Sequence, residues 1–216
     1  MTAAAEARRL AAELRAEAHR LLEDLDALAL LDRRFGSAAI VGSVDLDLMI
    51  WRDIDLYVAA EPEAGAAFLG TAPLLYERAE AAGHRIVSIS FNDEYRRPNS
   101  PYGHGLYCGF RLLTAQERLW KLDLWGWASN DYPRKVEEHP DLHRRMEKAD
   151  RDRVLELKSA VQGLPGYRDW MTSYDVYRFV LGERAGGVAE FQAFCRAGRS
   201  RDGHEPIGEE RRASPG

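Results

Sequence analysis

The sequence lacks the features of a membrane or secreted protein. Its longest uncharged stretch, residues 64–76, is interrupted by glycine and proline and falls short of the roughly 20 apolar residues that a membrane span needs. Cysteine is scarce: Cys108 and Cys195 permit one disulfide at most. The N-terminal segment has charges among its apolar positions, whereas a secretory signal needs a continuous hydrophobic centre. We therefore expect a protein of the reducing cytoplasm.

An excess of positive charge is also absent. Thirty Lys and Arg stand against 35 Asp and Glu, which gives a formal net charge of −5. A chain without a basic field cannot neutralise a run of phosphates, so bulk nucleic-acid binding is disfavoured. The acid excess is concentrated in residues 38–127, whereas acids and bases balance in residues 129–198. With 216 residues, 45% of them hydrophobic, the chain can bury one full-sized core or two small ones.

The N-terminal region, residues 1–37, is expected to be one long helix. Residues 3–34 are rich in good helix formers and contain no glycine or proline, and Gly36 then ends the helix. Apolar residues recur at helical spacing, and this stripe packs either on the chain's own core or on a second copy, so a monomer and a homodimer both remain open. The stripe consists of Leu14, Ala18, Leu21, Leu25 and Leu28.

The middle of the chain predicts a β-sheet. Short alternating or β-branched runs indicate strands at residues 38–43, 53–60, 85–91, 105–113 and 119–127. A helix is expected in the second half of residues 61–84, with Gly83 at its end. This order predicts an α+β fold with a mixed β-sheet covered by helices.

We therefore divide the chain into an N-terminal helix packing on the core, a sheet core at residues 38–128, a helical portion at residues 129–198 and a disordered tail at residues 199–216. In the helical portion, His-Pro-Asp at residues 139–141 indicates a helix start. Further helices are expected at residues 173–181 and 188–197.

Two acids in the second predicted strand carry the main chemical signal. Asp53 and Asp55 are two positions apart, so their side chains leave the same face of a strand about 7 Å apart. They repel each other unless a cation lies between them, and carboxylate oxygens are the hard ligands that Mg²⁺ prefers. Gly42 and Ser43 end the preceding strand, where backbone N–H groups can cradle a phosphate.

This arrangement resembles the signature of the DNA polymerase β-like nucleotidyltransferase superfamily. The signature places a Gly-Ser pair after a hydrophobic residue, then a short gap, then Asp-hydrophobic-Asp; here nine residues separate Ser43 from Asp53. A third carboxylate lies on a later strand in that family, and Asp123, between two leucines, fits this position. The resemblance covers residues 38–127.

The resemblance implies a nucleotidyltransferase-like mixed sheet and a reaction. A nucleoside monophosphate would pass from an NTP, such as ATP, to a hydroxyl of an acceptor, with release of pyrophosphate. Asp53, Asp55 and Asp123 would be the catalytic residues and the ligands of two Mg²⁺ ions, with Mn²⁺ as a possible substitute. Gly42 and Ser43 would bind the β- and γ-phosphates.

Other residues are candidates for nucleotide or phosphate binding. Lys121 shares the face of the third acid, where it contacts a phosphate or pairs with a neighbouring acid. Tyr107 and Arg111 share one face of residues 105–113 and either contact the base or triphosphate or form ordinary sheet surface. Trp125 and Trp127 are expected to be core or domain-interface residues rather than a ligand platform.

Some patterns indicate structural roles instead. Asp45 and Asp47 repeat the acid pair, but they follow the first strand too closely to begin a new one, so we interpret them as loop acids. His139 and His143 have no third ligand at a zinc spacing. Cys108 is interpreted as a small core residue, because no histidine or aspartate pattern indicates a thiol nucleophile.

The acceptor is expected to be a small molecule. The charge balance of residues 129–198 gives no basic surface for RNA, and members of the superfamily without nucleic-acid-binding additions often modify small molecules such as antibiotics. One alternative is a toxin-type nucleotidyltransferase acting on a protein or a tRNA. Another is a non-catalytic nucleotide-binding regulator, against which the complete set of three acids argues.

Overall fold

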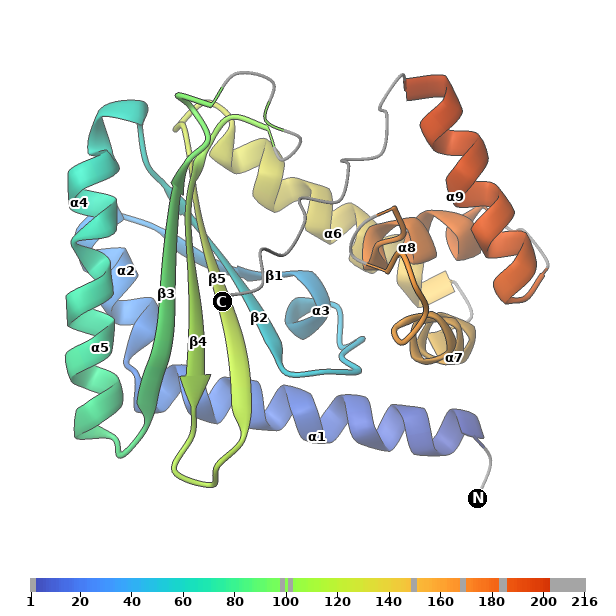
Figure 1. Cartoon of the computed structure of the whole chain (residues 1–216), viewed down its shortest axis with the longest axis horizontal. Coiled ribbons are helices and arrows are strands. Elements are labelled where there is room, and N and C mark those ends of the chain that lie inside the picture. The colour runs from blue at the N-terminus through green and yellow to red at the C-terminus, as the bar shows by residue number, and fades with distance from the viewer. Residues whose placement is uncertain are drawn as a thin grey trace, which may run out of the picture. The chain divides into compact units, whose positions relative to one another are not determined.

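The computed structural model describes residues 3–97, 100, 103–148, 151–167, 170–182 and 186–202 (Figure 1). The chain divides into two compact units, one spanning Arg8–Lys148 and the other comprising Met1–Ala7 and Ala149–Gly216. None of the helices in these described ranges combines the length and the apolar character that crossing a membrane requires.

The unit spanning Arg8–Lys148 is built on a mixed sheet. Its strands are β1 (Ala38–Val41), β2 (Asp53–Ala59), β3 (Arg85–Asp93), β4 (Leu106–Leu113) and β5 (Leu119–Trp127). The order across the sheet is β1-β2-β5-β4-β3, in which β2 and β5 are parallel and the other neighbours are antiparallel. The predicted strands and the predicted mixed sheet are confirmed.

The N-terminal region is two helices, so the prediction of one continuous helix is wrong. Helix α1 (Ala3–Asp24) ends before α2 (Ala27–Phe35), and Asp26 between them has a left-handed backbone with φ 41°. Arg78 of α5 (Thr71–Ala81) donates to the carbonyl oxygens of Leu25 and Asp26, at 3.0 and 2.7 Å, and to the Asp26 carboxylate at 2.7 Å. Aspartate tolerates this backbone conformation, and the arginine satisfies the carbonyls that the break exposes.

One face of the sheet forms the core. Ile54 and Leu56 of β2 and Leu122 of β5 are buried there, and Figure 1 shows α2, α4 (Gly65–Leu69) and α5 on this side, with the short helix η1 (Pro62–Ala64) preceding α4. The predicted N-terminal apolar stripe belongs to the same cluster: its first four members are buried and Leu28 packs against them. Within this chain the stripe therefore packs on the core.

The opposite face of the sheet carries polar side chains and lies beside α3 (Gly42–Asp45) and α6 (Tyr132–Lys148) (Figure 1). Helix α6 begins after a turn in which the Ala128 carbonyl oxygen accepts hydrogen bonds from Asp131 and Tyr132, both at 2.8 Å. Because α6 already begins at Tyr132, the helix start predicted at residues 139–141 falls inside this helix. This helix belongs to the unit of the sheet.

Besides the first residues of α1, the described part of the other unit contains three helices. They are α7 (Arg151–Val161), α8 (Ser173–Leu181) and α9 (Val188–Asp202). A capping box between Thr172 and Asp175 starts α8, and the Phe179 ring packs against Phe191 at 5.7 Å. The helices predicted at 173–181 and 188–197 are confirmed. Because α9 continues to Asp202, the first residues of the expected tail are helical, and residues 203–216 lie outside the described ranges.

Gly126 of β5 provides a test of the packing between the sheet and α4. A Cβ at this position would lie 2.8 Å from both Ala60 Cβ and Phe68 Cε2. We expect Gly126→Ala to lower the free energy of unfolding by about 1–3 kcal/mol through overpacking, measured by urea denaturation. The control is Gly163→Ala, where a Cβ would meet no atom of the described residues within 4 Å. Equal midpoints for the two variants would contradict this packing.

Candidate active site

The parallel pairing of β2 with β5 brings the three predicted acids together. Asp55 lies opposite Asp123 in the register, and Asp53 lies opposite Lys121. One carboxylate oxygen from each of Asp53, Asp55 and Asp123 lies within 4.8 Å of the others. Asp123 is buried and the other two are half-buried. These residues form a cluster of hard oxygen ligands that fits a divalent cation.

A neutral donor holds one oxygen of Asp53. The indole Nε1 of Trp51 donates to Asp53 Oδ2 at 3.2 Å. Trp51 was not among the predicted site residues, because it precedes the strand and no motif marks it. Its contact fixes the orientation of the first acid.

Asp123 is held on both of its oxygens. The Tyr107 hydroxyl donates to Oδ1 at 2.9 Å, and the Lys121 ammonium contacts Oδ2. Tyr107 reaches the acid by lying across Gly109, where a Cβ would come within 2.8 Å of Tyr107 Cζ. Burial, together with the negative charge of Asp123, raises the pKa of Tyr107 far above its usual value, so the phenol stays a neutral donor. The structure thus places this candidate nucleotide contact against the third acid.

Lys121 pairs with acids, which is one of the two alternatives that its position allowed. Besides Asp123, its ammonium lies 3.6 Å from Asp53 Oδ1. Burial by itself would lower the pKa of Lys121, but the charges of Asp53 and Asp123 outweigh it and raise the pKa above the usual value. The ammonium is therefore protonated across the physiological range.

The turn after β1 lies directly against Asp55. Gly42 has φ +69°, and a Cβ there would lie 2.5 Å from Asp55 Oδ2. Glycine is required for two reasons: the left-handed backbone and the close approach of the carboxylate. Ser43 follows within α3 and is half-buried. The predicted Gly-Ser pair and the acids are therefore neighbours in space.

Arg111 lies on the same face of the sheet, next to Lys121. The two residues are opposite each other in the antiparallel pairing of β4 with β5, so their side chains share a face. Arg111 is exposed, whereas Lys121 is half-buried. The structure thus leaves Arg111 as a solvent-facing cation beside the acids.

An aromatic cluster continues the acidic face along the strands. It consists of Tyr57, Tyr107, Trp125 and Trp127. The Trp125 and Trp127 rings stack at 5.3 Å and 10°, and Tyr107 packs on Trp125 at 4.8 Å. Tyr57 lies opposite Trp125 and was missed, although it follows Asp53 and Asp55 in the same alternation. Trp127 is buried, while the other three rings are half-buried.

Asp45, Asp47 and Cys108, which the sequence assigned to structural roles, do not belong to the acidic cluster. Asp45 lies in α3 and Asp47 in the turn after it, with φ 55°. Cys108 is buried in the core, as predicted, and burial raises the pKa of its thiol to about 12. The side chains of His139 and His143 lie outside the described residues.

Comparison with known proteins yields little. No protein-family model and no curated protein matches the chain. Among solved structures, one of a cytoplasmic RNA terminal U-transferase aligns with the chain at a TM-score of 0.38 and 16% sequence identity. The match covers 78% of this chain and 51% of the other, so this chain spans about half the length of that protein. A TM-score this low indicates only partial overlap, and the functional case rests on the geometry of the acids.

Substitution of Gly42 tests its contact with Asp55. We expect Gly42→Ala to lose about 1–2 kcal/mol of unfolding free energy from the left-handed backbone and a further amount from the collision with the carboxylate. Gly36→Ala is the matched control, because Gly36 has φ +78° and a Cβ there would meet no atom of the described residues within 4 Å. Urea denaturation gives the loss of unfolding free energy in each variant, and the difference between the two losses measures the collision with Asp55. Equal losses would show that Asp55 does not constrain this turn.

The burial of Cys108 predicts a thiol that does not react in the folded protein. Because its pKa is raised to about 12, the thiol is neutral at pH 8, and the nucleophilic thiolate is scarce. Iodoacetamide should therefore modify Cys108 only in concentrated urea, as followed by peptide mass spectrometry. Fast modification of the native protein would contradict the buried position.

Proposed function

We propose that the protein is a metal-dependent nucleotidyltransferase that moves a nucleoside monophosphate from an NTP to a hydroxyl of a small-molecule acceptor. The observation that supports this most is the convergence of Asp53, Asp55 and Asp123 on one face of the sheet. The glycine turn at Gly42 adjoins the same cluster. Acids with this spacing beside a turn of this kind suit a triphosphate with its counter-cations.

The donor set favours Mg²⁺, with Mn²⁺ as an acceptable substitute. All three ligands are carboxylate oxygens, and no soft ligand belongs to the described group. Bound to these acids, Mg²⁺ would neutralise charge on the triphosphate and lower the pKa of the acceptor hydroxyl.

Asp123 has a different role from the other two acids. Asp53 and Asp55 would hold the cation, to which the triphosphate would bind. Asp123 accepts the proton of the acceptor hydroxyl while the acceptor oxygen bonds to the α-phosphorus. The bond from the α-phosphorus to the bridging oxygen breaks, and pyrophosphate leaves with that electron pair. Tyr107 keeps Asp123 oriented through its hydrogen bond to Oδ1.

The turn and the exposed cation would bind the nucleotide. In this proposal, backbone N–H groups at Gly42 and Ser43 face the β- and γ-phosphates, and Arg111 adds positive charge on the same face. The half-buried rings of Tyr107 and Trp125 lie beside the acids and offer aromatic surface for the nucleoside. Stacking there would be tolerant of the base.

A small acceptor fits the charge of the chain better than a nucleic acid does. The net charge is −5, and acids and bases balance in residues 129–198. An antibiotic such as an aminoglycoside or a lincosamide is the acceptor class to test first. Modification of a protein or a tRNA is the alternative within the same chemistry, and a nucleotide-binding regulator is the alternative without turnover.

The decisive prediction concerns the acids. Asp53→Asn, Asp55→Asn and Asp123→Asn should each reduce Mg²⁺-dependent pyrophosphate release by at least about a hundredfold, because each removes a carboxylate that would hold the cation or accept the proton of the acceptor. The assay uses each NTP with and without candidate acceptors, and EDTA should abolish the signal. Circular dichroism checks that the fold survives.

The matched control is Asp47→Asn, since asparagine tolerates the φ of 55° at that position. This variant should retain wild-type activity. Transfer activity in all three cluster variants would overturn the assignment. NTP binding by the wild type without release of pyrophosphate would favour the regulator.

A further inference from the structure

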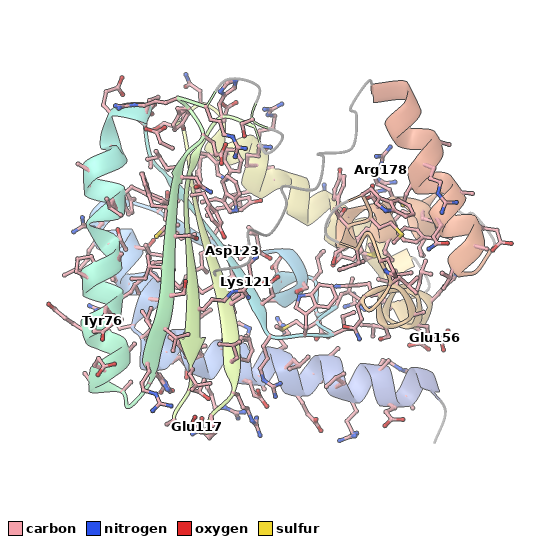
Figure 2. The ribbon with its side chains drawn as sticks, in the orientation of Figure 1. Tyr76, Glu117, Lys121, Asp123, Glu156 and Arg178 are labelled. Carbon is pink, nitrogen blue, oxygen red and sulfur yellow. The ribbon has the colours of Figure 1, made fainter. Side chains whose placement is uncertain are left out.

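The Lys121 ammonium lies among the acids that the proposed function assigns to metal. It contacts Asp123 Oδ2 and lies 3.6 Å from Asp53 Oδ1. Figure 2 labels Lys121 and Asp123 close together on the sheet. The Lys121 side chain is 21% exposed, so it reaches solvent while its charged end faces the carboxylates. A lysine in this position is a cation supplied by the protein itself.

A divalent cation and this ammonium compete for the same oxygens. Asp123 has Oδ1 occupied by the Tyr107 hydroxyl and Oδ2 by Lys121, so the side of the carboxylate that faces Asp53 is covered by the ammonium. Two cations a few ångströms apart repel strongly where water is partly excluded. The carboxylates can therefore bind either the divalent cation or the ammonium tightly, but not both.

Departure of the lysine would leave the acids oriented. Asp53 keeps the hydrogen bond from Trp51, and Asp123 keeps the one from Tyr107. Lysine is a point charge on a flexible four-carbon chain, so its ammonium can swing away without movement of the strand. The neutral donors Trp51 and Tyr107 thus orient the acids, whereas the Lys121 ammonium supplies the counter-charge.

We propose that Lys121 is the counter-ion of the metal-free site and that it leaves the carboxylates when a divalent cation binds, turning toward the phosphates of the nucleotide. The lysine stabilises the acids before metal arrives and sets the affinity at which metal replaces it. This inference rests on the proposed function, since it takes the acids as metal ligands. It also unites the two roles that the sequence allowed for Lys121 as two states of one side chain.

The first test compares Lys121→Met with the wild type. Without its counter-ion, the metal-free protein should melt at a lower temperature in EDTA, and Mg²⁺ alone should bind about tenfold more tightly, because it no longer displaces a cation. Calorimetric titration gives the affinity and thermal unfolding gives the stability. Lys121→Gln, which keeps a donor for Asp123 but not the charge, provides the same comparison should the methionine variant fail to fold.

Arg85→Met is the matched control. It removes the same charge from the same unit, at an exposed pair in which Arg85 donates to Glu117 at 2.8 Å. Its Mg²⁺ affinity should equal that of the wild type. Equal tightening in both variants would mean that net charge, and not the position of Lys121, controls metal binding, and the proposal would fall.

A second test observes the lysine directly. The chain contains only four lysines, so ¹⁵N-labelled lysine gives a simple spectrum in which Lys121 is identified by its loss in Lys121→Met. Saturating Mg²⁺ should shift the Lys121 ammonium signal well beyond any change at Lys158, whose ammonium donates to the Tyr177 hydroxyl at 3.0 Å in the other unit. An unchanged Lys121 signal in the saturated protein would overturn the displacement.

The outcomes separate the two proposals. A wild-type protein that binds no Mg²⁺, with or without nucleotide, would refute the metal site of the proposed function. A wild-type protein that binds Mg²⁺ and releases pyrophosphate, alongside a Lys121→Met variant with unchanged or weaker Mg²⁺ affinity, would refute the role of Lys121 alone.

Discussion

Repulsion among three carboxylates is the constraint around which the sheet unit is organised. Their ligand atoms lie within 4.8 Å of one another, and such a cluster is unfavourable unless other groups hold and neutralise it. A different device acts at each acid: an indole at Asp53, a glycine turn at Asp55, and a phenol together with an ammonium at Asp123. The destabilised face persists because the opposite face of the same strands is packed into the core.

The core face and the acidic face of the sheet depend on each other, because successive side chains of a strand point to opposite faces. In β2, the buried residues Ile54 and Leu56 alternate with Asp53, Asp55 and Tyr57, which lie on the opposite face. The register that places the apolar residues in the core therefore also places the acids on the other face. A slip by one residue would bury the carboxylates and expose the apolar side chains. The hydrophobic effect thus positions the charged groups, because the burial of the apolar side chains sets the register of the strands.

Local pattern was enough to predict the strands, whereas contacts between distant residues were not predictable. Period-two alternation located all of the described strands, and spacing within β2 indicated that Asp53 and Asp55 share a face. Asp123 was added to them through the family resemblance, because spacing within one strand does not show which strand lies next to it. The break at Asp26 depends on Arg78, which is far along the chain, so helix propensity gave no sign of it. The hydrogen bond from Tyr107 to Asp123 depends on the register of β4 with β5, and the role of Trp51 on the path of a loop.

The stacked indoles of Trp125 and Trp127 have a consequence for how the site can be observed. Their rings are 5.3 Å apart and nearly parallel, and they lie on the strand that carries Asp123. Indoles at this separation couple electronically, so their absorption and emission depend on their mutual orientation. Tyr107 links this pair to the acid, since its ring packs on Trp125 while its hydroxyl binds Asp123. The strand therefore carries a native optical reporter, one that requires no introduced dye.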